Sequence, residues 1–223
     1  MIHAILVFMV VIAAATAQAF SDGPVKFNNT FALMYTDDAA YTSRLLHMPH
    51  YQYSILSIKG DNKLDFDKNF ELRRYFLKPR ALVRLTPEFP LEFCAVGQVE
   101  AFWHKFDVTI RKSTVTKQAD WLEGRAGVAT VLKHHDSNFS IHMELDAFLY
   151  ETRSNGSVET YVTLKYKDVW VNNLLHIHFD ARKSYFEQVT VGYTIAKNMS
   201  VFWQGQSITD KALVNRLGLA VTF

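Results

Sequence analysis

The sequence predicts an all-β protein, an antiparallel up-and-down transmembrane β-barrel of about 12 strands. Three observations lead to this fold class. Apolar and polar residues alternate through most of the chain after residue 20, in short segments separated by turn-forming clusters. The polar faces carry charges deep within the segments, and aromatic residues gather at the ends of the apolar faces. A wall between lipid and a polar lumen accounts for all three.

The N-terminal residues predict export. An apolar stretch runs from Ile2 to Ala15 and is followed by Ala17-Gln18-Ala19, which fits a small-residue peptidase site. Spanning a bilayer as a helix takes about 20 apolar residues. We therefore predict a signal peptide over 1–19 and a barrel domain over 20–223. The stretch lacks the Lys or Arg that usually precedes the apolar part of a bacterial signal.

Twelve segments are predicted as strands. The clearest is 139–150, where the odd residues from Phe139 to Leu149 are apolar and the even residues from Ser140 to Asp146 are polar. Connections at 60–63, 86–90, 134–138 and 197–199 are short, whereas those at 36–50, 106–120 and 151–157 are longer. The predicted strands are 25–35, 51–59, 64–74, 79–86, 91–105, 121–133, 139–150, 158–167, 174–182, 187–196, 200–207 and 212–223.

One residue conflicts with this assignment. Lys68 falls on the lipid face of the third predicted strand, 64–74. A lysine there would cost about 2 to 4 kcal/mol near the membrane midplane. A bulge or a different register would remove the conflict.

The end of the chain carries a more specific pattern. Leu217, Leu219, Val221 and Phe223 share one face of the last predicted strand. This resembles the C-terminal signature of bacterial outer-membrane β-barrels, in which the last strand closes the sheet against the first. The resemblance implies that the four residues form an assembly signal for the barrel-assembly machinery, and it places the protein among outer-membrane lipid. In size and strand count the chain is most similar to the small oligogalacturonate-specific porins, although no residue motif carries their substrate over.

Charged residues on the polar faces are predicted to line the lumen. Opposed arginines and carboxylates around a water-filled constriction create a transverse field that orders polar solutes. We therefore expect a passive channel for small hydrophilic solutes. The same charges could instead pair with each other and plug a narrow barrel. The predicted pore-lining residues are Arg73, Arg80, Arg84, Glu100, Arg125, Glu144, Asp146, Lys165, Asp180, Arg182 and Arg216.

Other chemistries have weaker support. The formal net charge of +2 does not favour nucleic acid, and the single cysteine, Cys94, is expected to be an inert wall residue. His176 and His178 lie two apart on one strand face, but no third ligand stands at a diagnostic spacing, so we predict no metal site. We also predict no cofactor and no catalytic residue, since no G-x-S-x-G motif occurs.

Two alternatives stay open. An outer-membrane barrel enzyme acting on lipid could draw a triad from Ser140, His142, His176, His178 and Asp180. A secreted β-sandwich or lipocalin-like binding protein would also show alternating strands. Four glycosylation sequons favour this second alternative, and they begin at Asn28, Asn138, Asn155 and Asn198.

Overall fold

The computed structural model describes residues 25–37, 41–86, 91–110, 113–152, 155–179, 185–209 and 213–223. The predicted signal peptide, 1–19, lies outside these residues, and so do Asp180 and Arg182. The described part contains no helix that is long and apolar enough to cross a membrane.

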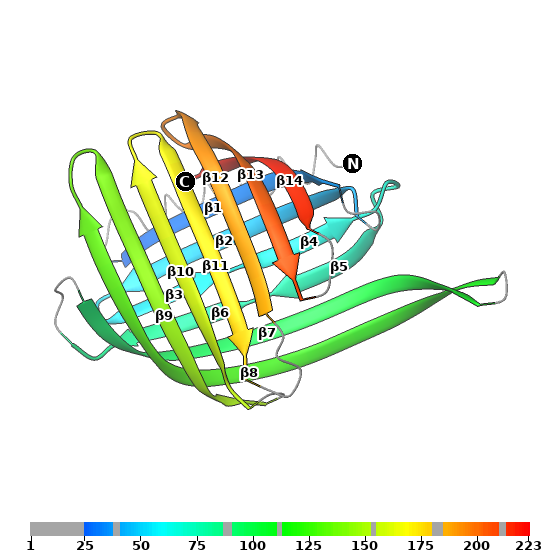
Figure 1. Cartoon of the computed structure of the whole chain (residues 1–223), viewed down its shortest axis with the longest axis horizontal. Helices are drawn as coiled ribbons and strands as arrows, with labels where there is room; N and C mark the ends of the chain where they lie inside the picture. Colours follow the sequence, from blue (N-terminus) through cyan, green and yellow to red (C-terminus); the bar gives the residue numbers. More distant parts are fainter. Residues whose placement is uncertain are drawn as a thin grey trace.

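The regular structure of the described residues consists of strands (Figure 1). In chain order they are β1 (Val25–Thr36), β2 (Ser43–Tyr53), β3 (Leu56–Gly60), β4 (Asn62–Phe66), β5 (Leu72–Leu77), β6 (Pro79–Arg84), β7 (Leu91–Ile110), β8 (Ser113–His135), β9 (Phe139–Glu151), β10 (Ser157–Tyr166), β11 (Val169–His178), β12 (Tyr185–Ala196), β13 (Met199–Ile208) and β14 (Val214–Thr222).

These segments form one antiparallel sheet that closes on itself. β1 pairs with β2 on one side and with β14 on the other, which joins the two ends of the sheet. β3 and β4 both pair with β2, at successive positions, and together form one interrupted strand. β5 and β6 both pair with β7 in the same way and form a second interrupted strand. The result is a closed barrel of 12 strands. This confirms the predicted fold class, a transmembrane β-barrel.

The interruptions lie side by side in neighbouring strands. Asp61 separates β3 from β4, and Lys78 separates β5 from β6. The Asp61 amide donates to the Lys78 carbonyl at 3.2 Å, so a hydrogen bond crosses this gap in the ladder. On the other side, an added Cβ at Gly60 would lie 2.8 Å from Cγ of Pro49 in β2. A proline has no amide hydrogen to donate to the ladder, which explains why the regular pairing breaks here.

The connections differ between the two ends of the barrel. At one end, which we call the short-turn end, the turns at 54–55, 136–138, 167–168 and 197–198 are tight. β1 begins and β14 ends at this same end, where Asn29 and Phe223 exchange backbone hydrogen bonds of 3.1 and 2.9 Å. The opposite, long-loop end carries the connections at 37–42, 67–71, 152–156, 179–184 and 209–213. The predicted alternation of short and longer connections is therefore present.

Several predicted boundaries in the first third of the chain are wrong. The expected loop 36–50 contains most of β2, and the expected turn 60–63 lies within the β3–β4 strand. The predicted strands 51–59 and 64–74 straddle the turns at 54–55 and 67–71. The strand total is still right, because three real strands stand where three displaced ones were expected.

The structure also changes two other sequence-based expectations. Lys68 lies in the β4–β5 turn and not on a lipid face, so its predicted conflict disappears. The expected loop 106–120 is mostly strand, because β7 continues to Ile110 and β8 starts at Ser113. In Figure 1 this hairpin extends well beyond the rest of the barrel wall.

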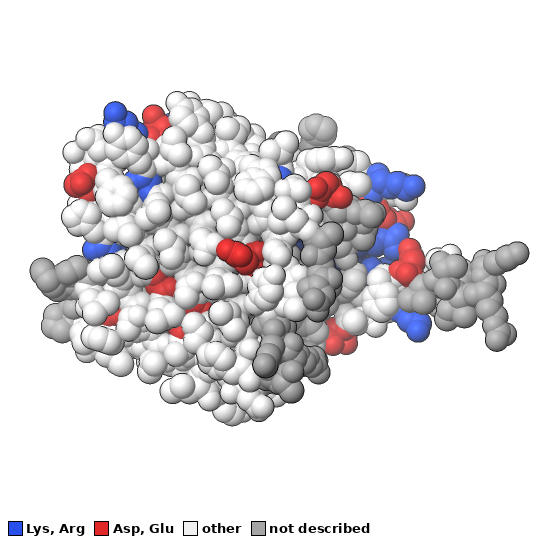
Figure 2. Space-filling model, in the orientation of Figure 1, with Lys and Arg blue, Asp and Glu red and all other residues white. Residues whose placement is uncertain are grey.

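The two faces of the wall have opposite chemistry. The outward Leu145 and Leu217 are 46% and 63% exposed, whereas the neighbouring lumen residues Asp146 and Arg216 are 0% and 3% exposed. Figure 2 shows few charged side chains over the middle of the visible wall and more of them near its ends. A soluble β-sandwich would bury its apolar faces and expose its charges, so this inverted arrangement favours a membrane barrel.

Several aromatic side chains on the outer face lie at strand ends, as predicted, although the exposed Trp203 lies in the middle of β13. Phe93, Phe139 and Tyr166 are exposed at the short-turn end, and Tyr35 is exposed at the long-loop end. Such positions match the two interfaces of a bilayer, where amphipathic rings are favoured.

The four sequons are divided between the two ends of the barrel. Asn28, Asn138 and Asn198 lie at the short-turn end, and Asn155 lies at the long-loop end. A barrel that spans a membrane exposes these ends to different compartments. The four sequons therefore do not all face the same compartment, and one set of glycosylation enzymes could not reach all of them. This distribution weakens the argument for a secreted glycoprotein.

Candidate functional site

The lumen holds buried clusters of different chemistry, and two of them contrast most. The charged cluster is formed by ionisable residues from β3 to β10, and the apolar cluster comes from β1, β2 and the last strands. The charged cluster comprises Lys59, Lys78, Arg80, Glu100, Glu123, Arg125, Glu144, Asp146, Glu151 and Glu159. The apolar cluster comprises Ala32, Met34, Leu46 and Phe202, with Met48, Trp170 and Ala220 packed against it. A further group of buried apolar residues lies beside the charged residues on β6 to β9 and comprises Leu82, Cys94, Val96, Ala129, Val131 and Phe148.

Ion pairs of the charged cluster cross the lumen. Lys78 Nζ, between β5 and β6, donates to the two carboxylate oxygens of Glu159 on β10 at 2.9 and 2.7 Å. Arg80 on β6 reaches Asp146 on β9 at 3.1 Å and also contacts Glu144. β7 and β8 lie between these strands in the sheet, so the bonds bridge two walls instead of running along one. Because both Glu159 and Asp146 are 0% exposed, side chains close this part of the cross-section.

Arg125 on β8 connects four strands. Its guanidinium lies 2.9 Å from Glu159, 3.2 Å from Glu100 and 3.3 Å from Glu123. Its Nε also lies 3.5 Å from Glu151 at the end of β9. The planar guanidinium offers five hydrogen-bond donors, which suits it to hold several carboxylates at once.

A second ionic group lies along the wall at the long-loop end. Asp65 on β4 accepts from Arg44 on β2 and from Arg74 on β5, with contacts of 2.5 Å to each. These three strands are neighbours in the sheet, so this group braces the wall without crossing the lumen. The displaced strand boundaries hid it from the sequence analysis.

The apolar cluster depends on close packing of aromatic rings against glycines. An added Cβ at Gly218 would lie 2.3 Å from the Phe202 ring, and one at Gly192 would lie 2.1 Å from the Trp170 ring. Only a residue without Cβ leaves room for these rings inside the barrel. The cluster therefore fills its share of the lumen by shape.

A small polar cavity lies at the short-turn end. It has a volume of about 150 Å³, and residues Ser54 and Ile55 of the first tight turn contribute to its lining. Lys133 and Arg84 line it too, and both contact Glu92, at 3.0 and 3.4 Å. Lys59, another lining residue, joins the cavity to the charged cluster through a 2.9 Å contact with Glu144.

The structure places the predicted pore-lining residues in different surroundings. Arg216 is on the lumen face and lies 3.3 Å from Gln204, while Lys165 is exposed near the short-turn end. Arg73 lies at the rim of the long-loop end, bonded to Asp67 at 2.8 Å. Those inside the charged cluster or its adjoining cavity are Arg80, Arg84, Glu100, Arg125, Glu144 and Asp146.

Lys59 and Lys78 were not predicted as lumen residues. Lys59 fell at the end of one displaced strand, and Lys78 fell in a gap between two others. The alternation Lys78, Arg80, Leu82 and Arg84 was a usable signal, since all four positions share one face. It was obscured by Pro79, which reads as a strand breaker.

Two of the histidines considered for a hydrolytic triad have glutamate partners outside the proposed set. His142 lies 3.3 Å from Glu144, and His176 lies 3.3 Å from Glu159. His50 and Ser57 do share a hydrogen bond, of 3.0 Å. Among the described residues, the charged neighbours of His50 are Lys59 and Lys133 and not a carboxylate, so this pair lacks the third group that orients a catalytic base.

Fold and lumen together define a transmembrane β-barrel with charged side chains in its interior. The structure is similar to that of the KdgM porin, with a TM-score of 0.53 and 8% identity over 88% of this chain and 99% of that chain. It is similar to a second structure, the KdgM porin in complex with disordered oligogalacturonate, with a TM-score of 0.51 at the same identity and coverage. No family model and no curated protein matches the sequence. At this identity the likeness concerns the fold.

Proposed function

We propose that the protein is an outer-membrane channel of the porin type, through which small hydrophilic solutes diffuse passively. The charged cluster carries this proposal, because ionisable side chains from facing strands give the barrel a polar interior that can stabilise water and small polar solutes. The barrel fold shared with porins supports it. In single-chain bacterial barrels the short turns are periplasmic, so we infer that the long-loop end faces outward.

The path runs through the charged half of the lumen. Ionised side chains stabilise water and polar solutes, whereas the apolar cluster offers them no hydrogen-bonding partner. The pairs Lys78–Glu159 and Arg80–Asp146 bridge this path, so a solute passes when it takes the place of one partner. The cavity of about 150 Å³ forms the vestibule on the short-turn side. Such a path limits passage to small solutes and gives a low conductance.

Planar-bilayer recording of the full-length protein tests the proposal. Replacing Lys78 and Arg80 with serine removes two bridging cations together with their bulk. We expect a larger single-channel conductance and a shift of selectivity towards cations. The recording is made in low salt, where screening extends over about 30 Å at 0.01 M and fixed charges stay visible.

A matched control removes two cations that do not bridge the lumen. The variant Arg44→Ser/Arg74→Ser loses the same formal charge from the wall at the long-loop end. We expect it to alter selectivity without a comparable rise in conductance. If wild type and the Lys78→Ser/Arg80→Ser variant both insert and neither conducts, the charges are a structural plug and the protein is not a channel.

We also propose that Leu217, Leu219, Val221 and Phe223 act as the assembly signal. Leu217 and Leu219 are exposed on the outer face, and the Phe223 backbone completes the closing pair with Asn29. Deleting Phe223 is expected to reduce the amount in the outer membrane, measured by fractionation, while export continues. Phe223→Leu retains the backbone pair and separates the role of the ring from that of closure. Normal amounts of both variants in the outer membrane would show that the terminal residue is no signal.

A further inference from the structure

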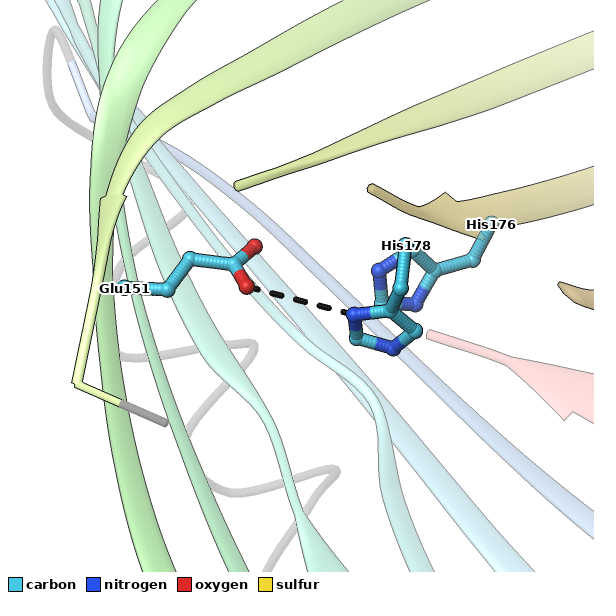
Figure 3. A group of neighbouring side chains, drawn as sticks. All are labelled: Glu151, His176 and His178. Carbon is cyan, nitrogen blue, oxygen red and sulfur yellow. Dashed lines mark ion pairs between the residues drawn. The ribbon is translucent and has the colours of Figure 1, made fainter. Parts of the chain in front are cut away.

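Three ligand-type side chains meet in the lumen near the long-loop end. Glu151 is the last residue of β9, and His176 and His178 lie near the end of β11 (Figure 3). One ligand atom from each residue can be chosen so that all lie within 4.8 Å of one another. The Glu151 carboxylate lies 3.9 Å from Nδ1 of His178, and the two imidazole rings are 4.1 Å apart between centroids.

Two atoms of this group are buried without a hydrogen-bond partner. They are Oε2 of Glu151 and Nδ1 of His178. The other Glu151 oxygen, Oε1, accepts from the Ser157 hydroxyl and lies 3.5 Å from Arg125. Buried polar atoms are nearly always partnered in native proteins, so unpartnered ones need an explanation. Here they approach each other from two strands, and Ser157 fixes the carboxylate in the required orientation.

His176 has the surroundings of a metal-ligating histidine. Its Nδ1 lies 3.3 Å from Oε1 of Glu159, a carboxylate that is itself held by Lys78. Histidine ligands commonly donate one ring N–H to such a carboxylate and bind metal through the other nitrogen. The Arg125 guanidinium lies 3.3 Å from that other nitrogen, Nε2. Arg125 must therefore move away from Nε2 when a metal binds. Its guanidinium can remain paired with Glu100 and Glu123 after this movement.

The charges around Arg125 are unbalanced. Among the described residues, four carboxylates, Glu100, Glu123, Glu151 and Glu159, contact two cations, Arg125 and Lys78, which gives this group a formal net charge of −2. In the adjoining part of the cluster, Lys59 and Arg80 are matched by Glu144 and Asp146. Buried charge without a counterion is expensive. One divalent cation would neutralise this excess.

We propose that Glu151, His176 and His178 bind a divalent transition-metal cation of the zinc class. Two imidazoles and one carboxylate are ligands that zinc accepts, at bond lengths of about 2.0 to 2.2 Å. Tetrahedral ligands at these lengths lie about 3.3 Å apart, so small side-chain rotations close the present distances. The cation enters from the long-loop end, where the His178 side chain is 24% exposed. This proposal departs from our sequence-based prediction of no metal site, because its third ligand comes from another strand.

Metal titration of the folded, full-length protein in detergent tests the site and needs no channel activity. Protein freed of metal with a chelator is titrated with Zn²⁺ by calorimetry and with Co²⁺ by visible absorption. We expect one ion per chain and the absorption bands of a four-coordinate Co²⁺ site. Glu151→Gln and His178→Asn should each weaken binding by at least about tenfold, because loss of even an outer-shell partner of a metal site costs about 10- to 100-fold in affinity. Heat-modifiable migration on a gel verifies that each variant is folded.

A control variant removes exposed histidines that could bind the metal at the surface. His134, near the end of β8, and Asp136, in the β8–β9 turn, are 3.9 Å apart and exposed at the opposite end of the barrel. His134→Asn/His135→Asn should therefore leave binding unchanged. If Glu151→Gln fails to fold, the less buried His178→Asn decides the matter. The proposal is overturned if wild type binds no stoichiometric metal, or if binding survives His178→Asn and is lost with His134 and His135.

Discussion

The charged and apolar clusters close the same lumen by different physics. In the charged half, Lys78, Arg80 and Arg125 are buried because carboxylates from facing strands neutralise them. In the apolar half, Phe202 and Trp170 are accommodated because glycines face their rings. The first arrangement depends on the presence of each partner and the second depends on volume. The difference teaches that one alternating strand pattern can support two kinds of barrel interior, which respond differently to substitution.

The largest expected effect is in the charged half. Glu159→Ala removes the carboxylate that holds Lys78, Arg125 and the Tyr161 hydroxyl. Breaking a buried ion pair from one side costs about 3 to 5 kcal/mol of folding free energy, measured by denaturant unfolding in detergent. Lys78→Met/Glu159→Leu should cost less than Glu159→Ala, since an apolar pair leaves no lysine charge stranded. A double variant that is less stable than the single one would show that volume decides here too.

A comparable loss of folding free energy is expected in the apolar half, but with a different dependence on volume and salt. Phe202→Ala leaves a cavity beside Met34 and Trp170 and should cost about 3 to 5 kcal/mol. Phe202→Leu should recover much of this loss because it restores volume. The destabilisation caused by Phe202→Ala should not change with salt concentration, because no charge is altered. The destabilisation caused by loss of an ion pair should change with salt concentration, because it leaves an unbalanced charge. Strong salt dependence for Phe202→Ala would break the distinction between the two halves.

The distinction assumes that both clusters face the lumen and that the opposite face meets lipid. Leu145→Arg places a charge on the exposed outer face and should cost about 2 to 4 kcal/mol near the midplane. Thr163→Arg, on the lumen face of the adjacent strand β10, should be mild. Unfolding from lipid bilayers measures both. Equal tolerance would mean that the outer face does not lie in hydrocarbon.

The smallest effect compares two glycines. Gly218→Ala forces a methyl group against the Phe202 ring and should cost about 1 to 3 kcal/mol through overpacking. An added Cβ at Gly97 meets no atom within 4 Å, so Gly97→Ala should stay within about 0.5 kcal/mol of wild type. Equal values for the two substitutions would show that the apolar half is not shape-dependent.

The strands were predictable where the alternation is unbroken. Segment 139–150 matches β9, Phe139–Glu151, because outward apolar residues alternate with polar lumen residues from Phe139 to Asp146. Prediction failed around Pro49, Gly60 and Pro79, which lie together at the interruption of the ladder. Each of these residues normally marks a turn. In this barrel the neighbouring strands keep the chain extended through them.

The contacts inside the lumen were not predictable in the same way. Composition and alternation placed Arg80, Arg125 and Asp146 on the polar face, but they do not say which residue meets which. The Lys78–Glu159 pair joins residues 81 positions apart and depends on the curvature of a closed wall. The metal-type group has the same origin, because Glu151 reaches the two histidines across β10.

The long β7–β8 hairpin projects beyond the barrel wall, so part of it lies outside the closed sheet (Figure 1). The ladder between β5 and β7 ends at Arg74 and His104, and the ladder between β8 and β9 ends at Arg125 and Glu151. Beyond these points, Lys105–Ile110 pairs only with Ser113–Gln118 in the described ladders. An isolated two-stranded ribbon is marginally stable in water, so its amide hydrogens exchange faster than those of the wall. A protease that cut this ribbon would leave all 12 strands of the barrel in place.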